Sequence, residues 1–426
     1  MAISRRYFLK TSGLSLFGAG IMVPSFMRRT AYALEQPSAR ARKKILVAIF
    51  QRGAADGLNI VVPYGERDYY SMRPSIAIPG PHQAAGDDPG AIDLDGFFGL
   101  HPSLKSLKPL FDAHQLAIVH AAGSPDSTRS HFDAQDYMES ATPGVKSTPD
   151  GWMNRYLQCS PQAEATPFRA VAFASTTPRT LMGSAPVLCT DDLRGFHFAG
   201  KNQQPGRSVQ LIASAFEEMY ASDRLLSGAS RETFEAISTL QRIQIGEYNP
   251  ENGAEYPKGP LGLHLQQIAQ LIKSDAGLEV AFAEAGGWDH HVNEGGVKGQ
   301  LAARLQEFGD ALAAFHKDMG DRMADIAVLT MSEFGRTARE NGNRGTDHGH
   351  ANSMFVLGGP VKGGKVYGNW PGLKEDQLHE GRDLALTTDF RDVFAEVAVR
   401  HLGVKDSAGV FPGFEVSPAR FRGFLG

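Results

Sequence analysis

The sequence predicts a three-layer α/β fold, with a mostly parallel central sheet flanked by helices. Short apolar runs of strand length alternate along the chain with longer segments of helical periodicity. The first of these runs, residues 44–50, is almost uninterrupted, which is typical of a strand buried on both faces. A chain of 426 residues, 42% of them hydrophobic, is long enough for one large domain with elaborations.

Strands are expected at seven runs: 44–50, 59–62, 116–120, 169–174, 278–283, 325–331 and 353–357. Helices are expected between them, at 102–113, 131–140, 208–222, 231–245, 261–273, 298–319 and 390–402. Strands that alternate with helices favour a sheet covered on both faces. Residues from about 195 to 260 are polar and helix-rich, so we expect a helical cap or insertion within a single domain at 34–426.

The N-terminus predicts an export signal. Residues 4–10, Ser-Arg-Arg-Tyr-Phe-Leu-Lys, match the twin-arginine motif, and a short Gly-rich apolar region follows. Ala31-Tyr32-Ala33 provides a cleavage site, so residues 1–33 are expected to be removed. An uncleaved anchor or a cytoplasmic tail is the alternative. We therefore expect the twin-arginine export machinery as a partner and a periplasmic or secreted protein, in which a metal loaded before export is common.

Composition limits the other partners. The formal net charge of -4 does not suggest a nucleic-acid partner. Cys159 and Cys189 are the two cysteines, and they could form one disulfide or remain two unpaired thiols. The oligomeric state is left open.

Five polar clusters carry the functional predictions, four of them directly after expected strands. The first follows residues 44–50 and contains Asp56. Ligands gather at the carboxyl ends of strands in α/β sheets, so Asp56 is a candidate metal ligand. The alternative is a turn, because Asp-Gly is favoured in turns.

The second cluster, residues 127–136, provides hydroxyl groups at the expected start of a helix, where free N–H groups favour an anion or an alkoxide. Ser130 is the preferred nucleophile, and its neighbour Arg129 is a candidate to hold the substrate's charge. Ser130 also stands at capping-box spacing from Asp133, so a helix cap is the alternative. The nucleophile stays open among three residues: Ser127, Thr128 and Ser130.

Three later clusters add metal-ligand chemistry. Asp289 and His291 follow a Gly-Gly turn and a tryptophan, and a carboxylate with an imidazole suits Zn²⁺ and similar ions. Glu333 lies where the strand at 325–331 ends, and Arg336 could hold an oxyanion, although a surface Glu–Arg pair is the alternative. The fifth cluster places three candidate ligands within four residues: Asp347, His348 and His350.

Together the clusters predict a metal-dependent site on one edge of the sheet. Two divalent ions there, zinc being one option, would grip the attacking and leaving oxygens of an ester. Other chemistries lack their motifs: there is no G-x-S-x-G elbow and no H-E-x-x-H. The segment that begins at Cys159 departs from the formylglycine motif of sulfatases, because Ala163 replaces the required Arg.

The chain resembles a family of bacterial twin-arginine-exported proteins of unknown function within the alkaline phosphatase and sulfatase superfamily. Six motifs carry the resemblance: residues 52–58, 100–102, 129–135, 286–291, 332–337 and 345–349. It implies an alkaline phosphatase-like sheet, a metal-ligating Asp after the first strand and a hydroxyl nucleophile at a helix start. Ser332-Glu333 replaces the superfamily's usual strand-end Asp-His pair, and Asp347-His348 stands in a later loop.

Two functions are expected. The first is a metal-dependent hydrolase of a phosphate or sulfate ester, small or polymeric, in which Ser130 attacks and Arg129 or Arg336 holds the charge. The second is a non-catalytic exported protein of the cell envelope that keeps the fold for binding or assembly. The replaced Asp-His pair favours the second.

Overall fold

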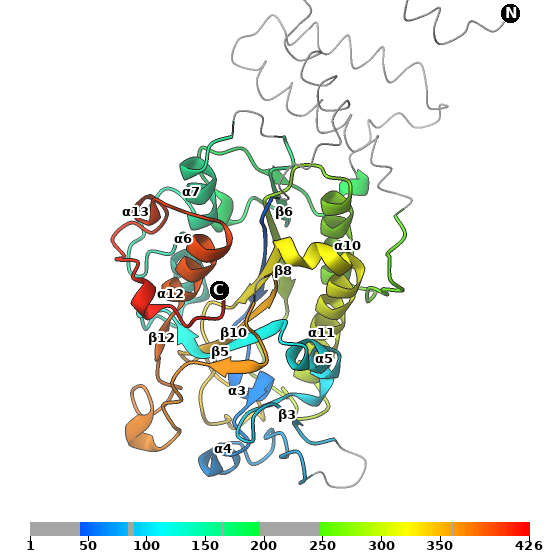
Figure 1. The fold of residues 1–426 in the computed structure, drawn as a ribbon. Helices are drawn as coiled ribbons and strands as arrows, with labels where there is room; N and C mark the ends of the chain where they lie inside the picture. The colour runs from blue at the N-terminus through cyan, green and yellow to red at the C-terminus, as the bar shows by residue number, and fades with distance from the viewer. Residues whose placement is uncertain (1–42, 84–88, 163–165, 196–247, 360) are drawn as a thin grey trace, which may run out of the picture. The chain divides into compact units, whose positions relative to one another are not determined.

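The computed structural model describes residues 43–83, 89–162, 166–195, 248–359 and 361–426. These residues belong to one of the two units into which the chain divides, residues 43–426. Within them, nine strands form one sheet in the order β11-β5-β10-β9-β1-β8-β6-β7, with β12 beside β5 (Figure 1). The strands are β1 (Ile45–Arg52), β5 (Leu116–Gly123), β6 (Ala170–Phe173), β7 (Leu188–Cys189), β8 (Val280–Gly286), β9 (Ile326–Met331), β10 (Asn352–Gly358), β11 (Lys365–Tyr367) and β12 (Thr388–Asp389).

The sheet is parallel apart from β10. β1 pairs in parallel with β8 and β9, and β8 pairs in parallel with β6. β10 runs antiparallel to both of its neighbours, β9 and β5. The amino end of β10 therefore lies at the same edge as the carboxyl ends of the strands beside it.

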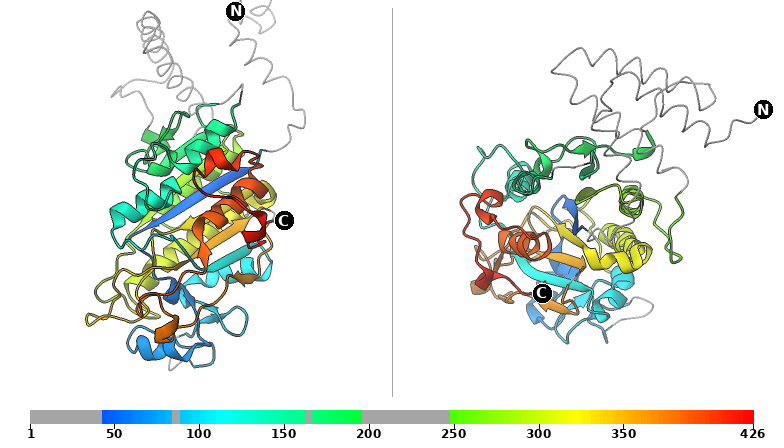
Figure 2. Two further views of the ribbon diagram at one scale, coloured as in Figure 1. Left: turned by 90° about the vertical axis from the view of Figure 1, so that its left-hand side faces the viewer. Right: turned by 45° about the horizontal axis from the view of Figure 1, so that its top comes forward.

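Helices cover both faces, as predicted, because β1 is apolar on both sides. Ile45, Val47 and Ile49 pack in one core with α5 (Lys108–Asp112), α10 (Pro260–Lys273) and α11 (Gln300–Met319). Leu46, Ala48 and Phe50 pack in the other. That second layer consists of α6 (His131–Ser140), α7 (Trp152–Cys159), α12 (Phe390–Glu396) and α13 (Ser407–Val410), and the sheet lies between the two layers (Figure 2).

The expected elements are largely confirmed. α6 has the predicted bounds, and the helix expected at 102–113 is a 3-10 turn, η1 (Pro102–Leu107), continued by α5. One expectation was wrong, and several elements were not expected. The run at 59–62 is a helical turn, α3 (Gly57–Ile60), before a short strand, β2 (Val61–Val62), and α7 was not expected. β2 pairs with β4 (Gly99–Leu100), beside β3 (Ile92–Asp93), in a small second sheet.

Several predictions fall on other parts of the chain. The signal segment at 1–33 and the helices expected at 208–222 and 231–245 lie outside the described residues. No helix among the described residues combines the length and apolar character needed to cross a membrane. Cys159 and Cys189 are both free thiols, so the disulfide alternative is not what the structure contains.

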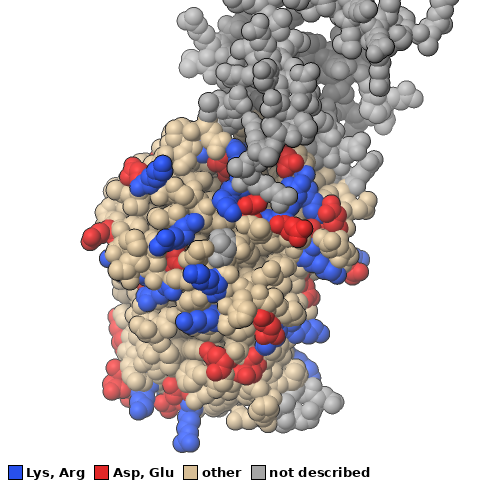
Figure 3. All heavy atoms as spheres, in the orientation of Figure 1, with Lys and Arg blue, Asp and Glu red and all other residues tan. Residues whose placement is uncertain are grey.

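The strand ends bring the predicted clusters to one edge of the sheet. Segments after β1, β5, β8 and β9 emerge there, and the connection from β9 returns to it because β10 is antiparallel. Residues after β9 pair with residues before β10: Gly335 N donates to His350 O at 2.8 Å, and Thr337 N donates to Asp347 O at 2.9 Å. Acidic and basic side chains are interspersed over the face shown in Figure 3.

Candidate metal centre

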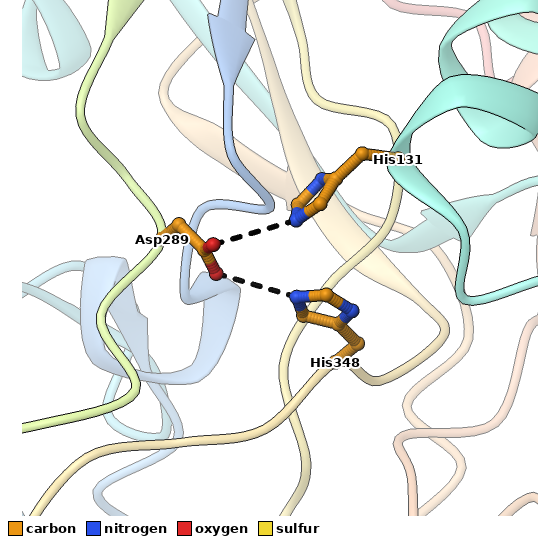
Figure 4. Close-up of side chains that lie close together, drawn as sticks. All are labelled: His131, Asp289 and His348. Carbon is orange, nitrogen blue, oxygen red and sulfur yellow. Dashed lines mark hydrogen bonds and ion pairs between the residues drawn. The ribbon is translucent and has the colours of Figure 1, made fainter.

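The histidine and aspartate side chains of three connections meet at this edge (Figure 4). His131 begins α6, Asp289 follows β8, and His348 precedes β10. Asp289 Oδ2 lies 3.6 Å from His131 Nε2, and Asp289 Oδ1 lies 3.3 Å from His348 Nε2. Among the residues that the structure describes, these three form the one group of His, Cys, Asp and Glu placed to share a metal ion.

His291 extends the cluster. Its Nε2 lies 3.0 Å from His348 Nε2 and 3.1 Å from Asp289 Oδ1. His291 thus contacts two members of the group, His348 and Asp289, and lies beside the three residues whose ligand atoms are all within 4.8 Å of one another. Nitrogen and carboxylate ligands of this kind suit a tetrahedral Zn²⁺ site.

The opposite nitrogen of each ring is held by an acceptor. His131 Nδ1 contacts Glu333 Oε1 at 2.8 Å, and His348 Nδ1 contacts the Arg129 carbonyl at 2.9 Å. His291 Nδ1 contacts Asp347 Oδ1 at 3.1 Å. A carbonyl or an ionised carboxylate only accepts, so each Nδ1 carries a proton, and in the neutral form of each ring the Nε2 lone pair is turned toward the cluster. Metal-ligating histidines are usually oriented in this way.

His131 Nε2 gives an independent indication of a ligand. This atom is buried and has no hydrogen-bond partner among the described residues. A buried polar atom without a partner is costly, and an ion is one recognised explanation. The residues present therefore fit a divalent metal by both donor chemistry and orientation.

Charges around the cluster favour ionised carboxylates. Burial alone would raise the pKa of Glu333, but hydrogen bonds from His131 and Gln135 lower it on balance. Burial also acts to raise the pKa of Asp289, and the Arg336 guanidinium outweighs it, so this pKa is lowered. The hydrogen bond to Glu333 raises the pKa of His131, whereas burial lowers the pKa of His348.

The loops of the cluster approach one another closely because of their glycines. Gly53 has φ +117°, and a Cβ there would lie 2.9 Å from the backbone nitrogen of Asp289. A Cβ on Gly345 would clash with the backbone of His291. Trp288 is buried against Phe308 of α11 and anchors the connection that carries Asp289. Any side chain at either glycine would push these connections apart.

Arg336 joins three connections of the site from within. Its side chain is fully buried and donates to the carbonyl oxygens of Gly53, Ala54, Trp288 and Thr346 and to Asp289. These partners use the donors of its guanidinium. Its contacts position Asp289, and the oxyanion-holding role expected for it stays a prediction.

Arg129 is also engaged. Its guanidinium forms ion pairs with Asp383 at 2.6 Å and Glu380 at 2.7 Å, while its carbonyl orients His348. The backbone of this residue is thus part of the site, and its side chain is directed to the two carboxylates. Its expected role in holding substrate charge stays a prediction.

The carboxylate of Asp56 is bound by a different residue from the three candidate ligands. Both of its carboxylate oxygens are bound by the buried guanidinium of Arg73, one of them at 2.9 Å. Arg73 also donates to the carbonyl oxygens of Thr337 and Ala338, after β9. The Asp56–Arg73 pair therefore joins the segment after β1 to the segment after β9. The expected metal ligation by Asp56 stays a prediction.

Three more predicted ligands have supporting positions in the structure. Glu333 is fully buried, and its Oε1 accepts from His131, from Gln135 at 2.8 Å and from Gly53 N at 2.9 Å. Asp347 orients His291. The ring of His350 is stacked on that of His379, with centroids 4.2 Å apart. Its neighbours therefore differ from those of the His348 ring. Their ligation of a metal stays a prediction.

The candidate nucleophiles lie in the turn before α6. Ser130 is the N-cap of α6, and its Oγ accepts from Asp133 N at 3.5 Å, as the capping alternative predicted. Thr128 Oγ1 accepts from Ser130 N at 3.3 Å. Ser127 and Ser130 are exposed, and Thr128 is half-buried.

His131 is the residue whose importance the sequence analysis missed. It lies within the second cluster, residues 127–136, in which Ser130 is the predicted nucleophile. The available signal was its position at the first turn of a helix that follows a strand, on the same edge as the other histidines. Only the fold shows which of the histidines at that edge share a centre.

Fold and site together define an α/β protein with a candidate metal centre at the carboxyl edge of its sheet. The chain belongs to the family described as "Protein of unknown function (DUF1501)", whose model matches residues 43–412. No protein among the curated ones matches it.

Solved structures similar to the chain include a sulfatase, a lipoteichoic acid synthase and a phosphonate monoester hydrolase. The sulfatase PsFucS1 from Pseudoalteromonas sp. is 12% identical over 95% of this chain and 75% of its own, with a TM-score of 0.37. The lipoteichoic acid synthase LtaP from Listeria monocytogenes is 9% identical over 77% and 69%, with a TM-score of 0.35. The phosphonate monoester hydrolase of Agrobacterium radiobacter is 10% identical over 89% and 79%, with a TM-score of 0.31. Likeness at this level assigns no activity.

Proposed function

We propose that this chain is an exported metal-dependent hydrolase of phosphate or sulfate esters. The observation that carries the proposal is the convergence of the Nε2 atoms of His131, His291 and His348 on Asp289, each imidazole being held from behind by an acceptor. A divalent cation bound there supplies Lewis-acid chemistry to an ester oxygen. Zinc is the ion that this donor set favours.

Different residues of the chain bind the metal, position its ligands and attack the ester. His131, His291, His348 and Asp289 hold the ion, and Arg336 keeps Asp289 in place. Ser130 is the proposed nucleophile, because it is exposed, directly precedes His131 and has only a long capping contact on its oxygen. No described residue accepts a hydrogen bond from its hydroxyl, so on attack its proton would pass to solvent water. The side chains of Asp289 and His291 are 45% and 40% exposed, so the cluster is accessible to an ester from solution.

The test is metal analysis followed by hydrolysis assays on the purified mature chain. We expect bound zinc, hydrolysis of an aryl phosphate or aryl sulfate after zinc addition, and loss of hydrolysis in Ser130→Ala with zinc retained. Thr128→Ala is the matched control and should keep activity. A protein that binds neither zinc nor any other divalent metal would contradict the proposal.

A second function is favoured by one observation. The guanidinium groups of Arg129 and Arg336, both expected to hold substrate charge, are occupied by carboxylates and carbonyl oxygens of the protein. A metal-binding protein of the cell envelope without hydrolytic activity would tolerate this. Bound zinc without hydrolysis of either ester class, in wild type and Ser130→Ala alike, would support this second function.

A further inference from the structure

One cationic side chain at the candidate metal centre is only partly used by the protein. Arg382 Nη2 donates to the carbonyl oxygen of His348 at 3.0 Å. Its Nη1 lies 3.8 Å from Asp383 Oδ2, an oxygen that Arg129 already binds at 2.6 Å. Within the described part of the chain, its Nε has no hydrogen-bond partner. The guanidinium thus keeps free donors, and its charge acts on the carboxylates of Asp383 and Asp347 without a short contact to either.

The other arginines near the cluster differ from it. Arg336 is fully buried among carbonyl oxygens and Asp289. Arg129 is bound by two carboxylates, and Arg52 lies between Glu139 at 2.6 Å and Glu284 at 2.7 Å. Releasing any of these would leave unpaired carboxylates behind. Arg382 can accept an anion without such a loss.

Position supports the same assignment. The carbonyl that Arg382 binds belongs to His348, whose imidazole is part of the cluster. The side chain of Arg382 is 40% exposed, so an anion can reach it from solution. One donor fixed on a carbonyl also limits the freedom of the long side chain, which reduces the entropy lost when it binds.

We propose that Arg382 binds the tetrahedral oxyanion, phosphate or sulfate, of a substrate held at the metal centre. This inference rests on the proposed function, because it needs the metal centre to receive the anion. The planar guanidinium offers a fork of donors that matches two oxygens of such a group. A lysine side chain would supply the positive charge without the paired N–H donors that bind two oxygens at once.

The experiment measures anion binding to the zinc-loaded mature chain by titration calorimetry, with inorganic phosphate and sulfate as probes. Arg382→Gln should weaken binding of the preferred anion by about tenfold or more. Arg382→Lys should lose less. Bound zinc, measured by elemental analysis, should be unchanged in both variants.

Arg322→Gln is the matched control. The side chain of Arg322 is similarly exposed, 34%, and also donates to backbone carbonyls. It precedes β9, so it lies at the amino end of that strand, whereas the metal centre lies at the carboxyl edge of the sheet. It should bind the anion as the wild type does. Equal phosphate and sulfate affinity in Arg382→Gln and the wild type would overturn the inference and leave the metal centre standing. Zinc binding without binding of either anion would overturn it too, whereas absence of bound metal would overturn the proposed function itself.

Discussion

The Nε2 atoms of His291 and His348 lie 3.0 Å apart. Each ring has its other nitrogen engaged, by Asp347 and by the Arg129 carbonyl respectively. Two neutral rings in these tautomers would face each other with lone pairs and no proton between them, which is unfavourable. A shared cation removes the conflict, and Asp289 supplies the negative charge that would accompany it.

Removal of His348 should abolish tight metal binding. We expect His348→Ala to weaken zinc affinity by more than about 100-fold, because a ligand is lost rather than a supporting group. His114→Ala is the matched control, since His114 precedes β5, contacts the Gly363 carbonyl and should leave zinc affinity unchanged. Competition with a chromogenic chelator measures both. Equal losses in the two variants would contradict the arrangement described.

Glu333 should act on the metal through His131. Glu333→Gln removes the charge that holds His131 Nδ1 while keeping the shape of the side chain. We expect zinc affinity to fall by about 10–100-fold, the usual effect of losing such a partner. Glu340→Gln, which alters a carboxylate bound to Ser75 and Ile76, serves as the control and should bind zinc normally. The prediction fails if both variants retain wild-type affinity.

Asp56 should contribute to folding more than to metal binding. Asp56→Asn removes the carboxylate that binds the buried guanidinium of Arg73, so we expect about 3–5 kcal/mol less stability in chemical denaturation. Asp112→Asn, in a surface pair with Lys108 of the same helix, should cost at most about 1 kcal/mol. The folded Asp56→Asn protein should still bind zinc. Loss of zinc at unchanged stability would instead make Asp56 a ligand, as the sequence suggested.

Stability should fall below neutral pH because His120 is buried as a neutral ring. Burial lowers the pKa of His120 to about 4, against about 6.5 in the unfolded chain. The unfolded state therefore binds more protons between these values, and the free energy of unfolding decreases as pH falls from 6.5 toward 4. The expected slope is about 1.4 kcal/mol per pH unit for such a histidine.

Urea denaturation at pH 7.5, 6.0 and 5.0 measures this slope. NMR titration of the folded protein reports the ring of His120 directly. A ring that titrates near 6.5 in the folded state, with a stability independent of pH over this range, would contradict the prediction.

The sequence by itself predicted the elements and the edge at which the clusters meet. Residues 45–50 are apolar throughout, which predicts β1 as a central strand, and the start of α6 at His131 follows from Ser130 as its N-cap. Polar residues after β1, β5, β8 and β9 then share an edge by the geometry of parallel strands. These signals are local, so they can be read from a single chain.

Tertiary structure alone decided which side chains share the centre. The antiparallel course of β10 returns His348 to the edge, where its Nδ1 meets the Arg129 carbonyl. Arg336 and Asp56 are predicted site residues in the sequence, and only the structure shows that Arg336 binds carbonyl oxygens and that Asp56 binds Arg73. His131 and Arg382 gain their importance from partners more than 100 and 30 residues away, respectively. Partners at such separations are set by chain packing, and no local periodicity encodes them.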